Sequence, residues 1–226
     1  MNFRYEQKKI SDGYHMVIGC DEVGRGCLAG PVVAGAVIMN LETWDMKQGV
    51  RDSKLLSVKK REELSSIIKE QALAWSIGQV SQEIVDEINI HNATLLAMRK
   101  AVEGLLFSHV VQAHGLPQKK KQAEGLHYKG TKRPFLVIDG KFTIPNFDID
   151  QEAVVDGDNK ILSIAAASII AKVYRDRLMT KIHQDYPIYN FAQHKGYGTL
   201  FHRTMILQNG LSSVHRKSFC KNLRSI

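Results

Sequence analysis

The sequence has few cysteines and no long apolar run. Its three cysteines, Cys20, Cys27 and Cys220, include no Cys-x-x-Cys pair, so neither a disulfide framework nor a zinc–cysteine site is expected. No apolar segment approaches the ~20 residues that a membrane-spanning helix needs. The polar start also lacks the apolar core of a signal peptide. These absences predict a reduced, cytoplasmic protein with no membrane partner.

Acidic residues are scarce relative to basic ones. The chain has 31 Lys and Arg against 23 Asp and Glu, a formal charge of +8. Such an excess suits a polyanion, most often nucleic acid, although it also serves solubility. Segment 118–133 holds six of the basic residues and one acid, which fits either a solvated loop or a loop that contacts phosphates. With 226 residues and 44% hydrophobic content, one sizeable core with a small appendage is expected.

The most informative stretch is 16–26. A short apolar run, Met16–Ile18, reads as a buried strand that ends at two adjacent acids, Asp21 and Glu22. Two acids at a buried strand end repel each other and lose hydration, so they need cations nearby. The alternative is a strand that simply leaves the core into a charged turn.

The turn after these acids, Gly24-Arg25-Gly26, also begins a match to the G-x-G-x-x-G/A dinucleotide fingerprint. That fingerprint needs a helix opening at the loop, with its N-terminus on the pyrophosphate. Here Pro31 and a β-branched run to Met39 follow instead, which indicates a second strand. A nucleotide-cofactor site is therefore excluded.

The remaining pattern alternates between strands and helices. Strands are expected at 31–39, 73–80, 135–138 and 152–155, and helices at 58–72, from 81, at 92–109, at 161–183 and at 199–208. Ser57 is the expected N-cap of the helix at 58–72. The alanines and serines of the helix at 161–183 predict close packing against the sheet.

Two further acids follow predicted strands. Asp139 ends the strand at 135–138, and Asp158 comes just after the strand at 152–155. The ends of neighbouring strands lie side by side, so these acids can join Asp21 and Glu22. Carboxylates suit Mg²⁺, and a pair of such ions about 4 Å apart can cleave a phosphodiester. Ser53 and Lys54 offer phosphate contacts, or only a solvated helix entry.

Several motifs resemble those of bacterial ribonuclease HII, a type 2 ribonuclease H. They occur in the family's order over residues 14–219, and they are Asp-Glu-Val-Gly-Arg-Gly at 21–26, Ile-Asp-Gly at 138–140, Leu-Ser-Ile-Ala-Ala-Ala-Ser-Ile-Ile-Ala-Lys-Val at 162–173, Gln-His-Lys-Gly-Tyr-Gly-Thr at 193–199 and the closing His-Arg-Lys-Ser-Phe. The resemblance implies an α/β, ribonuclease H-like fold, in which helices flank a mixed five-stranded sheet and a small C-terminal helical segment follows. It places the catalytic domain at 1–185 and a helical appendage with a basic tail at 186–226, in a monomer.

The resemblance also implies a function. Family members hydrolyse the RNA of RNA–DNA hybrids and cut on the 5′ side of single ribonucleotides in duplex DNA, leaving 3′-hydroxyl and 5′-phosphate ends. Two divalent ions, Mg²⁺ or Mn²⁺, would be held by Asp21, Glu22, Asp139 and Asp158. The substrate-binding residues would be Gly24, Arg25 and Gly26 at the 2′-hydroxyl, Ser53 and Lys54 at phosphate, and Tyr197 on the deoxyribose 3′ of the ribonucleotide.

Some alternatives stay open. Asp176 is a rival for the fourth metal ligand, while Asp158 is also a possible helix N-cap. Another two-metal nuclease or a junction resolvase would share this fold and its carboxylates. A non-catalytic nucleic-acid-binding module would explain the charge but not the acids.

Overall fold

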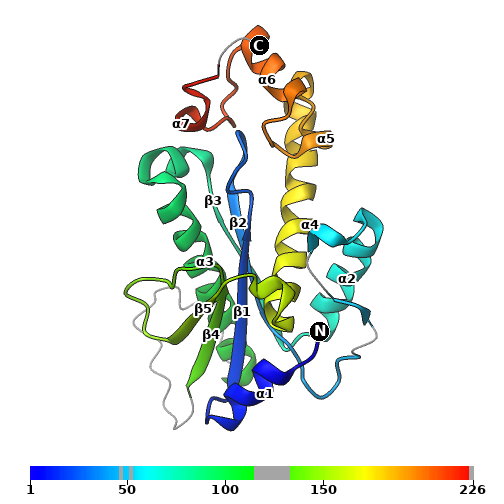
Figure 1. Cartoon of the computed structure of the whole chain (residues 1–226), viewed down its shortest axis with the longest axis vertical. Coiled ribbons are helices and arrows are strands. Elements are labelled where there is room, and N and C mark those ends of the chain that lie inside the picture. Colours follow the sequence, from blue (N-terminus) through cyan, green and yellow to red (C-terminus); the bar gives the residue numbers. More distant parts are fainter. Residues whose placement is uncertain (46–47, 51–52, 115–132, 224–226) are drawn as a thin grey trace.

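The computed structural model describes residues 1–45, 48–50, 53–114 and 133–223. A five-stranded sheet in the order β3-β2-β1-β4-β5 forms its centre (Figure 1). The strands are β1 (Met16–Val23), β2 (Val32–Ile38), β3 (Ala74–Val80), β4 (Pro134–Asp139) and β5 (Asp150–Val154). β1 runs antiparallel to β2 and parallel to β4, so the sheet is mixed, as predicted.

Strand β1 is longer than predicted. It continues through both acids to Val23, because Asp21 pairs with Gly35 of β2 and Glu22 with Ala34. The expectation that the strand ends at the acids is therefore wrong. β5 also begins at Asp150, two residues before the predicted start at Glu152.

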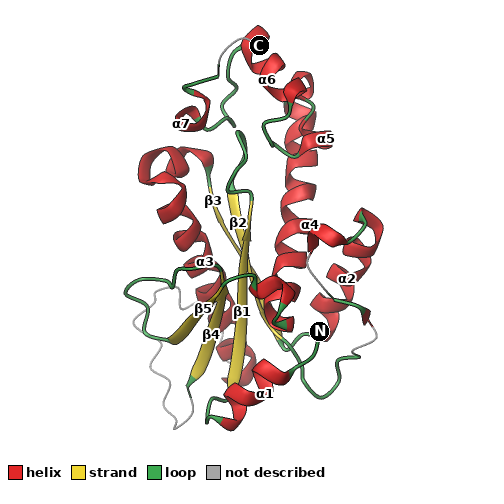
Figure 2. Ribbon diagram, in the orientation of Figure 1, coloured by secondary structure: helices red, strands yellow, loops and turns green. Residues whose placement is uncertain are grey.

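Seven helices lie within the described residues (Figure 2). They are α1 (Arg4–Ser11), α2 (Val58–Gln71), α3 (Gln82–His114), α4 (Leu162–Asp185), α5 (Phe191–His194), α6 (Leu200–Asn209) and α7 (Lys217–Cys220). Short 3₁₀ turns, η2 (Ser53–Leu55), η3 (Gly157–Asn159) and η4 (Pro187–Tyr189), join some of them. Ser57 caps α2 as predicted, since its hydroxyl accepts the backbone N–H of Lys60 at 3.2 Å.

Helix α3 contains a break that matches the two helices expected in this region. Asn89 has a φ of 65° and a ψ of 164°, which are not helical. Its side-chain oxygen accepts the backbone N–H of Asn92 at 3.1 Å, as an N-cap does. A first helix thus stops before Asn89 and a second begins after it.

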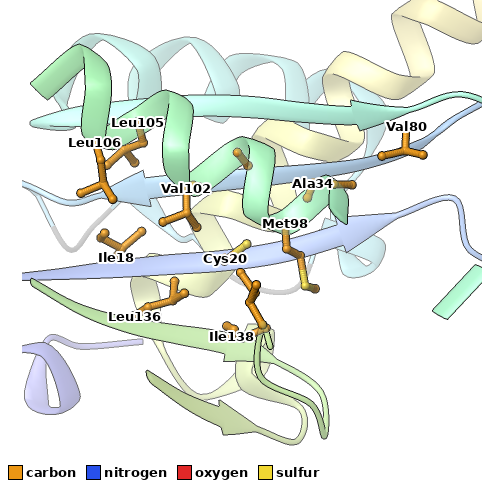
Figure 3. Close-up of a cluster of buried hydrophobic side chains, with 14 of the residues drawn as sticks. Ile18, Cys20, Ala34, Val80, Met98, Val102, Leu105, Leu106, Leu136 and Ile138 are labelled. Atoms are coloured by element: carbon orange, nitrogen blue, oxygen red, sulfur yellow. The ribbon is translucent and has the colours of Figure 1, made fainter. Parts of the chain in front are cut away.

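Helices α3 and α4 cover opposite faces of the sheet. On the α3 side, Figure 3 shows Ile18, Cys20, Leu136 and Ile138 of the strands packed against α3. On the α4 side the contact is very close, because a Cβ added at Gly19 would lie 2.2 Å from the carbonyl carbon of Ser163. The small side chains of α4 therefore lie directly against the sheet backbone, as predicted.

The chain after α4 forms a small core of its own. Figure 1 shows α5, α6 and α7 at the end of the molecule opposite α1. Phe191 and Ile206 pack there with Met179 of α4 and Ala29 from the turn after β1. Because the two parts share this core, the division at 185/186 stays a prediction.

Two observations concern the predicted surroundings of the protein. No helix in the described part of the chain is long and apolar enough to cross a membrane. The basic segment 118–133 lies outside the described residues, except for Arg133.

Candidate active site

Asp21 and Asp139 stand side by side on neighbouring strands. Cys20 pairs with Ile138, and each acid is the next residue along its strand. Since Cys20 and Ile138 face the α3 core, strand alternation directs the two acids toward α4. Asp21 is only 5% exposed.

Negative charge is concentrated at this point. Burial raises the pKa of Asp21 well above its usual range, and the charges of Glu22 and Asp139 raise it further, against a hydrogen bond from Ser168. Burial also raises the pKa of Glu22, although the neighbouring Arg25 opposes the shift. Acids that repel one another in a buried place favour a bound cation.

Asp158 lies next to this group on η3. The backbone N–H of Gly157 donates to Oδ1 of Asp139 at 2.7 Å, which ties the turn to the end of β4. Nζ of Lys54 lies 3.5 Å from the Asp158 carboxylate. Asp158 is not the cap of α4, whose N-cap residue is Ile161.

The rival ligand Asp176 has another partner. It lies mid-helix on α4, where its carboxylate pairs with Nζ of Lys172 at 2.7 Å. The same Lys172 ammonium lies 5.8 Å from the ring centre of Tyr197. Asp176 therefore belongs to the surroundings of Tyr197.

The donor set fits a hard divalent ion. It consists of carboxylate oxygens, which suit Mg²⁺ and Mn²⁺. Within the described ranges, no three His, Cys, Asp or Glu side chains already gather closely enough to hold an ion. Glu22 and Asp158, the two outer acids of the set, each pair with a basic side chain. Arg25 lies 3.2 Å from the Glu22 carboxylate, and Lys54 lies 3.5 Å from that of Asp158. Ion binding would therefore require these carboxylates to turn away from their basic partners.

Ser53 contacts Asp21 indirectly, through Ser168. Its hydroxyl is buried and lies 3.0 Å from the hydroxyl of Ser168, which in turn hydrogen-bonds to Asp21. The guanidinium of Arg61 donates to the Ser53 carbonyl at 2.7 Å. Of the predicted pair of phosphate contacts, only Lys54 extends into solvent, with 77% of its side chain exposed. The predicted contact of Ser53 with phosphate stays a prediction.

A shallow pocket opens beside the acids on the α3 side. Its volume is about 20 Å³, enough for about one water molecule. Its lining includes Glu22, Arg25, Asp139, Lys141, Phe142 and His91. Acidic and basic groups thus meet at this opening, as binding a metal and a phosphate together requires.

The two glycines of the Gly-Arg-Gly turn have different surroundings. Gly24 has a φ of +92°, and a Cβ added there would lie 2.2 Å from Nε of Arg175. Gly26 is exposed, and a Cβ added there meets nothing within 4 Å. The fold itself therefore needs glycine at position 24 but not at position 26.

Tyr197 lies beside this turn. Its backbone forms an antiparallel bridge with Cys27, the residue after Gly26. The neighbouring Gly196 carbonyl accepts the N–H of Leu28 at 2.8 Å. The Tyr197 side chain is 42% exposed. The structure thus joins two predicted site segments that are far apart in the sequence.

Two arginines that sequence analysis missed fix both segments. Arg175 and Arg216 are fully buried, and both donate to backbone carbonyls. Arg175 bonds the carbonyls of Ala29, Pro31 and Lys195 at 3.1, 3.0 and 2.8 Å. Arg216 bonds those of Gly30 and Arg25 at 3.0 and 2.8 Å. No local pattern marks either residue, since Arg175 has the charged neighbours Asp176 and Arg177 and Arg216 is followed by Lys217. A guanidinium can satisfy several carbonyls at once, but only after folding brings them together.

Comparison with known proteins gives a consistent result. The sequence profile of the family described as Ribonuclease HII matches residues 18–222. The chain is 42% identical to the ribonuclease HII of Caldicellulosiruptor saccharolyticus, over 98% of this chain and 95% of that protein. It is 43% identical to that of Vibrio vulnificus, over 96% and 89%. Among solved structures, the RNase HII of Archaeoglobus fulgidus, determined in complex with PCNA, is 26% identical with a TM-score of 0.67, over 93% of this chain and 98% of that one.

Proposed function

The chain belongs to the ribonuclease HII family and is a ribonuclease H, and from that premise we propose that it cuts on the 5′ side of single ribonucleotides in duplex DNA. It would also hydrolyse the RNA of RNA–DNA hybrids, leaving 3′-hydroxyl and 5′-phosphate ends. The protein would act as a cytoplasmic monomer on these duplexes.

One observation carries the proposal. The repelling acids Asp21 of β1 and Asp139 of β4 lie side by side, and β1 leads into a turn that carries the open Gly26 beside Tyr197. A cation site and a surface for a sugar therefore adjoin each other. A binding module without catalysis would gain nothing from the buried acids.

Asp21, Glu22, Asp139 and Asp158 would hold two Mg²⁺ or Mn²⁺ ions. When bound, such ions activate a water and stabilise the leaving oxygen of a phosphodiester. Ser168 hydrogen-bonds to Asp21, and its contact with Ser53 keeps that carboxylate in one orientation.

The basic partners of the outer acids would then turn to the substrate. Arg25 and Lys54 have 47% and 77% of their side chains exposed, so they can move from a carboxylate to a phosphate with little loss of packing. The carboxylates of Glu22 and Asp158 are only 13% and 6% exposed, so a bound metal ion would have to take the place of the departing basic group.

The ribose of the substrate would be recognised by the Gly-Arg-Gly turn and by the loop that carries Tyr197. Only a residue without a side chain allows the backbone close enough to hydrogen-bond a 2′-hydroxyl, the group that separates RNA from DNA. Gly26 is open on that side. The exposed Tyr197 ring would stack on the next deoxyribose and so sense the RNA-to-DNA step.

A cleavage assay tests the proposal. A labelled DNA duplex with one ribonucleotide is incubated with Mg²⁺, with Mn²⁺ or with EDTA, beside an all-DNA duplex and a four-way junction. We expect metal-dependent cleavage 5′ of the ribonucleotide and intact all-DNA duplex. Cleavage of the junction alone would favour a resolvase, and binding without cleavage would contradict the proposal.

A further inference from the structure

Three buried histidines lie behind the Tyr197 loop. His194, His202 and His215 are 8%, 0% and 2% exposed, and they come from α5, α6 and the segment before α7. The rings of His194 and His202 stack with centres 4.3 Å apart. Phe191 packs edge-on against both of these rings. No part of the proposed chemistry uses these imidazoles.

The hydrogen bonds of His202 fix which of its nitrogens carries the proton. Nδ1 lies 2.8 Å from the carbonyl oxygen of Tyr197, which can only accept, so Nδ1 donates. Nε2 lies 3.0 Å from Nε2 of His215. In the neutral ring Nε2 carries no hydrogen, so it accepts from His215.

His215 must then have the opposite tautomer. Its Nε2 donates to His202, so its Nδ1 is the acceptor. Nδ1 indeed lies 2.9 Å from the backbone N–H of Ser212 and 2.8 Å from the Ser212 hydroxyl, both of which can donate. Each atom in this chain of hydrogen bonds thus has a single consistent role.

His194 holds the residue before Tyr197. Its Nδ1 accepts the backbone N–H of Gly196 at 3.2 Å, and its Nε2 donates to the carbonyl of Tyr189. Gly196 has a φ of +87°, and a Cβ added there would lie 2.5 Å from the Ala29 carbonyl oxygen. The segment Gly196–Tyr197 is therefore held at its first amide by His194 and at its last carbonyl by His202, and these two imidazoles stack on each other.

We propose that His194, His202 and His215 are positioning residues that hold the Tyr197 loop against the Gly-Arg-Gly turn. His202 holds the Tyr197 carbonyl, His194 holds the Gly196 amide, and His215 fixes the tautomer that His202 needs. The inference rests on the proposed role of Tyr197 in sensing the RNA-to-DNA step. It assigns the C-terminal appendage a part in substrate selection.

Neutral rings are essential to this arrangement. If His202 gained a proton, two N–H groups would point at each other across 3.0 Å. A proton gained by His215 would sit on Nδ1 and oppose the backbone N–H of Ser212 at 2.9 Å. Burial lowers the pKa of both rings to about 4, against backbone hydrogen bonds that favour the charged forms. The hydrogen bonds of His194, His202 and His215 to the Tyr197 loop and to one another, which we call the clamp, are thus intact at neutral pH.

The tautomers can be observed directly. Long-range ¹H–¹⁵N NMR of the wild-type full chain distinguishes Nδ1–H from Nε2–H imidazole. We expect Nδ1–H for His202 and Nε2–H for His194 and His215 at neutral pH. The opposite tautomer at His202, or fast exchange between tautomers, would overturn the proposal even if no variant folds.

A double-mutant cycle tests the function of the clamp. His202→Leu removes both hydrogen bonds, His202→Asn keeps a donor close to the position of Nδ1, and Ile206→Ala perturbs the same small core without touching the loop. The readout is kcat/KM for a DNA duplex with a lone ribonucleotide divided by kcat/KM for a long RNA–DNA hybrid. We expect His202→Leu to lower this ratio about 5- to 20-fold, as the loss of buried hydrogen bonds implies, with partial rescue in His202→Asn and no change in Ile206→Ala.

Tyr197→Ala separates the two proposals. In the Tyr197→Ala background, His202→Leu should lower the ratio no further. If Tyr197→Ala lowers the ratio and His202→Leu does not, the positioning role is overturned and the proposed function stands. If Tyr197→Ala leaves the ratio unchanged, both the role of Tyr197 and the clamp are overturned. If Ile206→Ala and His202→Leu lower the kcat/KM ratio equally, the histidines contribute only general packing and the positioning role is overturned.

Discussion

At the scale of single residues, the two glycines of the turn have different physical reasons to be glycine. Gly24 has a positive φ and a buried neighbour, the guanidinium of Arg175. Gly26 has neither, because the space beside it is open. A requirement for glycine at position 26 must therefore come from a molecule that binds there.

Alanine substitutions at Gly24 and Gly26 should have different effects, one on folding stability and the other on substrate binding. We expect Gly26→Ala to change the free energy of unfolding by less than about 1 kcal/mol and to lower kcat/KM about 100-fold, because the methyl group displaces the ribose. Gly24→Ala should instead lose about 1–3 kcal/mol of stability. Urea unfolding and a cleavage assay on both variants provide the comparison. Full activity in Gly26→Ala would contradict the proposed contact.

Asp21 opposes the stability of the metal-free fold. Its pKa in the folded state is raised by burial, whereas the unfolded value is about 3.9. Between these two pKa values the folded state binds more protons, so stability falls as pH rises through that window. An asparagine at position 21 does not ionise, so it would not cause this loss of stability.

We therefore expect Asp21→Asn to abolish cleavage and to raise the Tm of the metal-free protein at neutral pH, by about 2–4 °C for each kcal/mol gained. At about pH 3 and below the two proteins should melt alike, since the acid is then largely protonated in both states. Mn²⁺ should raise the Tm of the wild type but much less that of the variant. Calorimetry with Mn²⁺ and with EDTA measures this, and Asp148→Asn, an exposed acid, is the control. A lower Tm in Asp21→Asn would refute the argument.

At the scale of elements, the position of α4 depends on glycines in the strands beneath it. Gly19 of β1 and Gly35 of β2 each leave no room for a Cβ against the α4 backbone. This close contact brings Ser168 within reach of Asp21. A shift of α4 would therefore change both the packing and the site.

Gly19→Ala should show both effects. The added carbon would lie 2.2 Å from the Ser163 carbonyl carbon, so α4 has to move. We expect a loss of about 1–3 kcal/mol, as for other overpacked cores, together with weaker cleavage. Urea unfolding measures the loss, with Gly26→Ala as the matched glycine-to-alanine control. Unchanged stability would mean that α4 is less tightly constrained than the contact implies.

Much of this framework follows from local sequence. The β-branched run at 31–39, the serine cap of α2 and the alanine-rich helix each have a physical signal within a few residues, and the structure bears them out. β1 was predicted too short because its acids look like the end of a strand. Pairing with β2, which forms only when the chain turns back after Val23, keeps them inside it.

Other features have no local signal. Helix α1 is polar along most of its length, yet Glu6 is buried and accepts the backbone N–H of Ser163 at the start of α4. Arg175 and Arg216 looked like ordinary surface charges. Their partners are carbonyls about 144 to 191 residues away along the chain, except for Lys195. Such contacts appear only once the chain is folded.

At the scale of the whole molecule, the chain carries a net charge of +8, whereas Asp21, Glu22 and Asp139 place negative charge close together. The net positive charge attracts a polyanion, while the acids would repel it from the proposed site of cleavage. Lys54 and Arg25 stand between the two, paired with acids in this structure. Metal ions would release these basic groups by taking over the carboxylates, so metal and nucleic acid are expected to strengthen each other's binding.

Salt dependence tests this coupling. Each phosphate contact contributes about 0.9 to the slope of log K against log salt for duplex DNA. With Ca²⁺ present as a cleavage-silent ion, we expect Lys54→Gln to reduce the slope by about one. In EDTA, where Lys54 still pairs with Asp158, the same substitution should change the slope little. Lys8→Gln, on α1 at the other end of the molecule from the C-terminal helices (Figure 1), should change neither slope. Fluorescence anisotropy over a range of salt concentrations gives all of these slopes, and an equal change with and without Ca²⁺ would show that Lys54 reaches phosphate independently of the acids.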